Sequence, residues 1–141
     1  MRDLHNNIAV KRGISPVAAT VDNTPWVSQI VDTQGFGSCE FILLTGTLTD
    51  ADATFVVLVE DGNAANLSDA AAVADAYLLG TELQAGFDFS HDNACRKIGY
   101  VGPKRYVRLT VTPANNTGNV FLAGAWLLGY PQSVPTANPP A

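Results

Sequence analysis

The chain has 141 residues, of which 47% are hydrophobic and 15% are charged, and its formal net charge is -5. A chain of this length fits one domain that can bury a core without the help of a metal or a disulfide. Between Gly13 and Cys95 there are only acidic charges and no Lys or Arg. This argues against a general nucleic-acid-binding protein, because such a protein needs clustered basic residues.

The two ends of the chain differ from its middle. Residues 1–14 are rich in Asn and charge and have no helical or strand period, so we expect an extended arm lying on a neighbour or along its own domain. Four prolines in residues 131–141 exclude a helix or a central strand and predict an extended tail. Residues 15–130 then form one domain. The polar N-terminus lacks the apolar core of a signal peptide, and no apolar run is long enough to span a membrane, which predicts synthesis in the cytoplasm.

Short apolar segments alternate with Gly, Pro, Asn and Asp turns along the middle of the chain. The pattern predicts strands over Ser15–Val21, Trp26–Val31, Ser38–Leu48, Thr54–Glu60, Tyr77–Leu83, Gly86–Ser90 and Val120–Leu128. One helix is predicted over Asn66–Asp75, with Ser68 as its N-cap. Roughly seven to nine short strands with one minor helix predict an all-β sandwich or jelly roll.

The stretch RKIGYVGPKRYVRLTVTP, residues 96–113, carries most of the basic residues: Arg96, Lys97, Lys104, Arg105 and Arg108. Two strand-like segments separated by a Gly-Pro-Lys turn predict a β-hairpin. In its second strand Val107, Leu109 and Val111 face the core, and Arg108 faces away from it. The basic face either pairs across strands with the domain's own carboxylates or docks against an acidic partner, including a neighbouring copy.

No group of residues predicts catalysis or a cofactor. The best candidate calcium ligands, Asp50, Asp52, Glu60 and Asp61, lack the Gly and the bidentate Glu of an EF-hand loop, so a solvated loop is favoured. Ser90, His91 and Asp92 stand side by side without a G-x-S-x-G motif, and we expect His91 to cap a turn.

Cys39 and Cys95 have no C-x-x-C spacing and no nearby pair of His residues. Nothing in the sequence indicates an oxidising compartment. Both are expected to be buried free thiols rather than a disulfide.

Several stretches resemble a family of small proteins of tailed bacteriophages and prophages, over nearly the whole chain. The resemblance lies in RDLHNNI, in VDTQGFGSCEFILLTGTLTDADATFVVLVEDG, in NLSDAAAVADAYLLGT, in HDNACRKIGYVGPKRYVRLTVTP and in the closing LGYPQSVPTANPP. Its most specific parts are Asp50–Phe55, Lys97–Tyr100 and Lys104–Leu109. Genes of this family tend to lie close to that of the major capsid protein.

The resemblance implies a capsid decoration, or cement, protein that binds the outer surface of an HK97-type shell and stabilises it. Its partner would be the phage major capsid protein, its location the outer surface of the virion, and its state a homo-oligomer, with a trimer favoured and a dimer as the alternative. No enzyme activity, nucleic acid, membrane or cofactor is expected. We expect capsid or intersubunit contacts from charged residues of the arm and the predicted hairpin: Arg2, Asp3, Lys11, Arg12, Lys104, Arg105 and Arg108.

Two other functions compete with this one. A carbohydrate-binding or host-surface-binding module displayed on the virion would be favoured by a shallow, solvent-facing row of the aromatic residues Trp26, Tyr77, Tyr100, Tyr106, Trp126 and Tyr130. A hydrolase would require a cleft with two carboxylates or a metal.

Overall fold

Six long strands and five strands of two residues build the part of the chain that the computed structural model describes, which comprises residues 1–17 and 19–140. The strands are β1 (Ile8–Ile14), β2 (Trp26–Val27), β3 (Val31–Asp32), β4 (Phe36–Leu48), β5 (Thr54–Gly62), β6 (Ala71–Ala72), β7 (Leu78–Leu79), β8 (Phe87–Asp88), β9 (Cys95–Tyr100), β10 (Tyr106–Ala114) and β11 (Val120–Pro131). The helices are α1 (Glu82–Ala85) and three 3-10 turns, η1 (His5–Asn7), η2 (Asp75–Tyr77) and η3 (Phe89–His91). None of these helices has the length and apolar character needed to cross a membrane.

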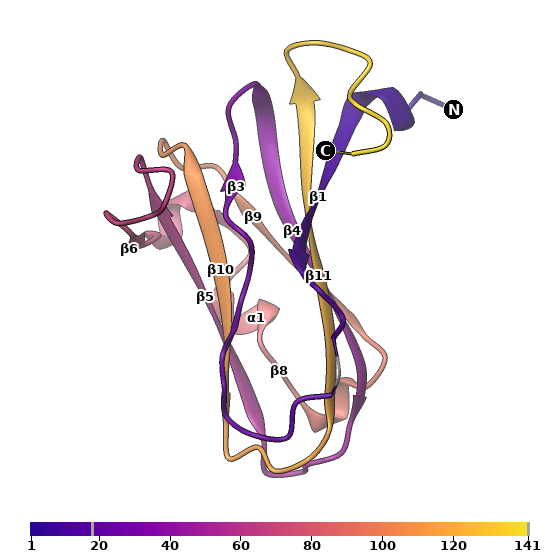
Figure 1. The fold of residues 1–141 in the computed structure, drawn as a ribbon, viewed down its shortest axis with the longest axis vertical. Helices are drawn as coiled ribbons and strands as arrows, with labels where there is room; N and C mark the ends of the chain where they lie inside the picture. The colour runs from indigo at the N-terminus through magenta and orange to yellow at the C-terminus, as the bar shows by residue number, and fades with distance from the viewer. Residues whose placement is uncertain (18, 141) are drawn as a thin grey trace.

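The strands form two antiparallel sheets that pack face to face (Figure 1). Sheet A has the order β1-β11-β4-β9-β7, and sheet B has the order β2-β10-β5-β6, with β3 also on β10 and β8 also on β5. Along the chain, β4, β5, β9, β10 and β11 fall alternately in sheet A and sheet B. This alternation is the jelly-roll form of the predicted sandwich, and it confirms the predicted fold class.

The predicted hairpin over residues 96–113 is wrong. Both strands exist, but β9 pairs with β4 of sheet A, whereas β10 pairs with β5 of sheet B. The connection through Gly102 and Pro103 crosses from one sheet to the other. Turn residues bend the chain locally but do not fix which sheet receives the next strand, so the sequence placed the turn correctly and the pairing incorrectly.

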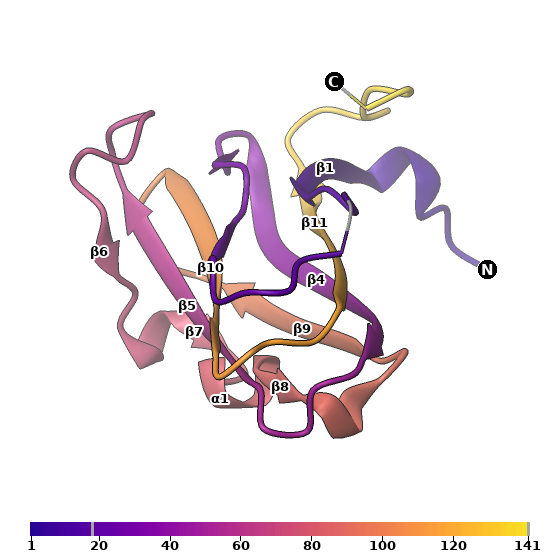
Figure 2. The same cartoon turned by 60° about the horizontal axis from the view of Figure 1, so that its bottom comes forward.

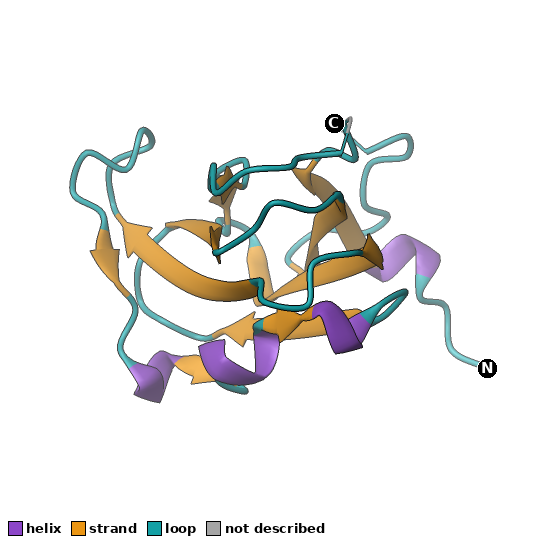
Figure 3. Cartoon of the chain, turned by 90° about the horizontal axis from the view of Figure 1, so that it is seen from below, coloured by secondary structure: helices purple, strands orange, loops and turns teal. Residues whose placement is uncertain are grey.

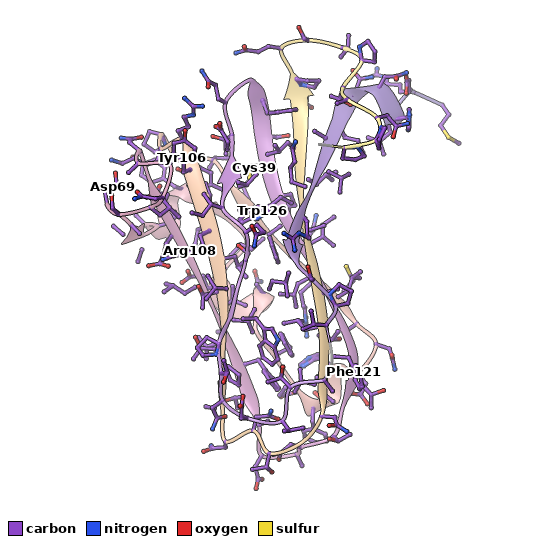
Figure 4. The ribbon with its side chains drawn as sticks, viewed as in Figure 1. Cys39, Asp69, Tyr106, Arg108, Phe121 and Trp126 are labelled. Carbon is purple, nitrogen blue, oxygen red and sulfur yellow. The ribbon has the colours of Figure 1, made fainter. Side chains whose placement is uncertain are left out.

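The core lies between the sheets and is built by alternate residues of each long strand. Val107, Leu109 and Val111 of β10 are each at most 1% exposed, as predicted, and Arg108 lies on the opposite face of that strand. The buried rings of Trp126 and Phe41 meet edge to face, with ring centroids 4.7 Å apart. Trp126 is labelled in Figure 4. Edge-to-face packing of two fully buried rings adds to the stabilisation from burial alone.

The predicted helix over Asn66–Asp75 is wrong. Leu67 has a positive φ of 52°, and the Asp69 carboxylate accepts hydrogen bonds from the backbone N–H groups of Asn63 and Ala64. An Asp that bonds nearby backbone in this way holds a loop rather than a helix. The α-helix forms instead at Glu82–Ala85, where Thr81 and Gln84 make a reciprocal capping box.

Helix α1 contacts β5 of sheet B and β9 of sheet A, and so bridges the two sheets along one side of the sandwich (Figure 3). The Glu82 carboxylate accepts a hydrogen bond of 2.6 Å from the backbone N–H of Val59 on the edge of β5. The 3-10 turn η2 precedes α1 in the chain, and η3 follows it. The side of the sandwich that α1 covers lies along the lower edge of Figure 2.

Part of the predicted arm belongs to a sheet. Residues 8–14 form β1, which pairs with β11 at the edge of sheet A, so this part lies along its own domain. The tail lies beside the start of the chain, where the Thr136 N–H donates to the Asn6 carbonyl at 3.0 Å. The predicted edge strand over Ser15–Val21 is wrong for the residues that are described, which show only an isolated bridge between Thr20 and Val120. Ala18 and Ala141 lie outside the described residues.

Candidate functional site

The basic residues predicted as one contact surface lie on different parts of the fold. Arg105 makes a two-pronged ion pair with Asp32, through Nε at 2.8 Å and Nη2 at 2.7 Å, and these hydrogen bonds lower the pKa of the Asp32 carboxyl. Arg108 pairs with Glu60, its direct cross-strand neighbour on β5, at 2.7 Å. Both arginines are thus held by carboxylates of sheet B, which is the cross-strand pairing that the sequence left open. Figure 4 shows Arg108 beside β10.

Lys104 takes part in a buried network through its backbone. Its N–H donates to the Tyr100 hydroxyl at 3.0 Å, and that hydroxyl donates to the Asp61 carboxylate at 2.7 Å. Burial, together with the hydrogen bond to Asp61, raises the pKa of Tyr100. The network ties the connection between β9 and β10 to the end of β5, so the crossing between sheets is fixed by hydrogen bonds as well as by packing.

The charged residues of the arm are also divided. Arg2 and Asp3 line a groove on sheet A, and Asp3 accepts hydrogen bonds from the Asn6 N–H and side-chain amide, which lower its pKa. Arg12 lies farther along β1, where it donates to the Ser15 hydroxyl at 2.9 Å. Lys11 is next to it on the same strand. The arm residues therefore lie along one edge of sheet A, whereas the two ion pairs lie on sheet B.

A groove of about 850 Å³ lies on the outer face of sheet A, and we call it the sheet A groove. Its floor comes from β11, β4 and β9, one side from residues 2–8 and the other from β7 and Val101. The residues that line it are Arg2, Asp3, Leu4, Asn7, Ile8, Ser38, Cys39, Glu40, Ile42, Leu79, Lys97, Tyr100, Val101, Leu127, Gly129 and Tyr130.

Two glycines, Gly99 and Gly129, deepen this groove because they have no side chain at positions where a strand residue would point into it. Gly99 lies opposite Glu40 across β9 and β4, and a Cβ on Gly99 would come within 2.8 Å of Glu40 Oε2. Gly129 lies opposite Ser38, and a Cβ there would come within 2.6 Å of Ser38 Oγ. The missing side chains leave room over two strands, and the side chains of Glu40 and Ser38 occupy part of it.

The lining of the groove combines six aliphatic side chains with four charged ones, which are Arg2, Asp3, Glu40 and Lys97. Ile42, Leu79 and Leu127 form much of the surface, and Leu79 is 56% exposed. Partial burial raises the pKa of Glu40, while the positive charge of Lys97 acts in the opposite direction. A concave face of this kind excludes water from a few charged groups, which suits a binding surface.

The candidate chemical groups do not form a catalytic or metal site. Asp50 accepts from Thr117, Glu60 from Arg108 and Asp61 from Tyr100, so these carboxylates point to separate partners. Among the residues that the structure describes, no three His, Cys, Asp or Glu side chains gather to hold a metal ion.

The Ser90, His91 and Asp88 side chains are close but cannot act as a triad. Asp88 Oδ1 lies 2.9 Å from His91 Nδ1, and Ser90 Oγ lies 3.5 Å from the same nitrogen. A triad places the carboxylate and the nucleophile on different ring nitrogens. His91 instead completes the capping box of η3, which confirms its predicted role at a turn.

The aromatic residues do not form the solvent-facing row that would favour a carbohydrate-binding surface. Trp126 and Tyr100 are buried, and Trp26 packs against Phe55 with ring centroids 6.2 Å apart. Tyr130 is 83% exposed and stands at one end of the sheet A groove.

The cysteines are free, as predicted, but differ in burial. Cys39 is buried beneath the groove floor, and burial raises its pKa to about 12. Cys95 is exposed, contrary to the prediction, because it points outward at the start of β9, opposite Leu44.

No protein-family model and no curated protein sequence matches this chain. Solved structures with a similar fold include the CBM22-1 and GH10 modules of Clostridium thermocellum xylanase 10B in complex with xylohexaose (12% identity, 95% of this chain, 28% of that chain, TM-score 0.45). They also include a structure of infectious bursal disease virus strain Gx (9% identity, 91% of this chain, 35% of that chain, TM-score 0.46). A third is the xylan-binding module CBM15 (7% identity, 94% of this chain, 96% of that chain, TM-score 0.43). The chain spans about a third of the xylanase and bursal virus chains. These likenesses concern the sandwich fold alone.

The sheet A groove was not predicted from the sequence. Its signal is the occurrence of Gly99 and Gly129 at outward positions of otherwise regular strands. An isolated glycine in a strand often marks a close approach of another group. That signal becomes interpretable only when the register shows that Gly99 faces Glu40 and Gly129 faces Ser38.

Proposed function

We propose that this chain is a bacteriophage capsid decoration protein that docks on the outer surface of the shell through the outer face of sheet A and acts there without catalysis. The observation that carries the proposal is the sheet A groove, a wide and mainly apolar surface that also has four charged side chains in its lining. An open apolar face of this kind on a soluble domain is typical of a protein interaction site. The motifs quoted above supply the class of partner, the phage major capsid protein.

The stabilising effect follows from mass action. A protein that binds assembled shells and not free subunits stabilises the shell in proportion to occupancy and affinity. A symmetric homo-oligomer, such as a trimer at a local threefold position, would raise its effective affinity through several simultaneous contacts. Such a protein would be located on the virion exterior after synthesis in the bacterial cytoplasm.

The test compares two aspartate substitutions on opposite faces of the sandwich. Leu79→Asp places a charge in the groove, and Val56→Asp places one on the outer face of sheet B, where Val56 is 61% exposed. Shells assembled from the major capsid protein of the same phage or prophage are mixed with each variant, and bound protein is measured by co-sedimentation. Leu79→Asp should lose occupancy, and Val56→Asp should bind as the wild type does. Equal binding by both variants contradicts docking through this face.

The arm requires a shorter truncation than the sequence suggests. Removal of residues 1–12 would delete most of β1 and disturb sheet A. Removal of residues 1–4 leaves β1 intact and takes away Arg2 and Asp3. Reduced binding to the shells after this truncation would place these two residues at the contact, and unchanged binding would exclude them from it.

A second candidate function is binding of a glycan in the same groove. The observation that favours it is Tyr130, whose exposed ring stands beside the polar groups of Asp3, Asn7 and Ser38. An exposed ring next to hydrogen-bonding groups can stack on one face of a sugar. A glycan array with the wild type and Tyr130→Ala tests this candidate, which requires binding that the substitution removes.

A further inference from the structure

Glu40 is the half-buried carboxylate of the sheet A groove, and its side chain has no hydrogen-bond donor among the described residues. It is central in β4, between Leu127 of β11 and Gly99 of β9. Its carboxylate occupies the space left by the missing side chain of Gly99, since a Cβ on that glycine would meet Glu40 Oε2 at 2.8 Å and the Cβ of Leu79 at 2.9 Å. The carboxylate is therefore partly enclosed by backbone and an aliphatic side chain.

The other carboxylates that are buried or half-buried within the described residues each accept a hydrogen bond. The pairs are Asp50 with Thr117, Glu60 with Arg108, Asp61 with Tyr100, Glu82 with Val59, and Asp88 with Ser90. The Glu40 carboxylate accepts no hydrogen bond and forms no ion pair with any described residue, although Arg2 and Lys97 also line the groove. Lys97 acts on it only through its charge at a distance.

A half-buried carboxylate without a donor is unfavourable, and it becomes more so when a partner displaces the remaining water. Neither Arg2 nor Lys97 pairs with Glu40 in this structure, so the carboxylate is open to a donor from a partner that covers the groove, and a cationic donor compensates the desolvation best. The guanidinium group of arginine offers paired N–H groups to a carboxylate, and the ammonium group of lysine offers a compact charge. The aliphatic side chains of Ile42, Leu79 and Leu127, which also line the groove, suit aliphatic side chains on either side of that cation.

We propose that Glu40 is a specificity-determining residue of the sheet A groove, which binds an extended protein segment in which aliphatic residues flank one arginine or lysine. This role of Glu40 rests on the proposed function, because it requires the outer face of sheet A to be the docking surface. It adds to that function the chemistry of the segment that the groove binds. A protein segment is favoured over a glycan because the floor is aliphatic and its exposed ring, Tyr130, stands only at one end.

The experiment compares Glu40→Gln with Asp52→Asn, an equally conservative change at an exposed carboxylate in the loop between β4 and β5. Binding to the same shells is measured by co-sedimentation at low and at physiological salt. Glu40→Gln should weaken binding about 10-fold and flatten its salt dependence, because a charge-assisted hydrogen bond is lost. Asp52→Asn should bind as the wild type does. Thermal unfolding should show both variants folded, since Glu40 has no internal partner to lose.

The outcomes separate the two proposals. If Leu79→Asp loses binding and Glu40→Gln retains it, the docking face stands and the basic anchor is overturned. If Leu79→Asp and Glu40→Gln both bind shells as the wild type does, the docking face and the role of Glu40 are both refuted. If Glu40→Gln loses binding to a glycan and not to shells, the groove is a sugar site and a basic protein segment is not its ligand.

Discussion

Replacing Tyr100 with Phe removes one buried hydroxyl and leaves two groups without their partner. The Asp61 carboxylate, 8% exposed, loses a donor at 2.7 Å, and the backbone N–H of Lys104 loses an acceptor at 3.0 Å. A hydrogen bond to a charged group contributes about 1.5–3 kcal/mol and a neutral one about 1 kcal/mol, so we expect a loss of about 3 kcal/mol in the free energy of unfolding.

Equilibrium unfolding in urea near neutral pH measures this loss. Tyr77→Phe is the control, because Tyr77 is 44% exposed and its substitution should change the free energy of unfolding by less than about 0.5 kcal/mol. A loss below about 1 kcal/mol for Tyr100→Phe would mean that the network adds little beyond the burial of the ring. The connection between β9 and β10 would then not be held in place by the hydrogen bonds of Tyr100.

Three further predictions concern the core, the surface and pH. Phe41→Ala should lower the free energy of unfolding by about 3–5 kcal/mol, because Phe41 is fully buried against Trp126; a smaller loss in urea unfolding would mean that the core collapses around the cavity. A double-mutant cycle of Arg108→Met and Glu60→Gln should give a coupling of about 1 kcal/mol, and zero coupling would contradict a stabilising pair. Burial raises the pKa of Cys39 from 9.0 to about 12, so its neutral thiol stabilises the fold below pH 9 and this contribution is lost as pH rises from 9 towards 12. Between pH 8 and 10 the wild type should lose about 1.4 kcal/mol more than Cys39→Ala, and parallel pH profiles would refute this.

Local patterns predicted the strands better than their partners. The alternation of Val107, Leu109 and Val111 correctly identified the inward face of β10, because side chains in a strand point to opposite sides by geometry alone. The pairing of β9 with β4 depends on contacts between residues more than fifty positions apart. The turn at Gly102 and Pro103 contains no information about that choice.

The helix was misplaced because propensity and hydrogen bonding compete over a few residues. The segment around Leu67 is rich in Ala, yet the Asp69 side chain bonds the backbone of Asn63 and Ala64 and keeps the segment a loop. At Thr81 and Gln84 the same kind of side-chain bond favours a helix because the spacing matches a capping box.

The candidate site was the least predictable part. The sequence favoured clustered charge as the sign of a contact surface, but Arg105 and Arg108 have carboxylate partners within the domain. The distinctive group is a carboxylate without a partner, Glu40, and the absence of a hydrogen bond cannot be seen in a sequence.

Strand β11 lies between β1 and β4, so a strand that is synthesised after both of them joins β1 to the middle of sheet A. While the ribosome is still upstream of residue 120, β1 has no strand to pair with and β4 has an open edge. Pairing between such distant segments is slow, and an open apolar edge promotes aggregation. A chain that stops before residue 120 should therefore yield no smaller folded unit. Slower synthesis at reduced temperature should raise the soluble yield of the full chain.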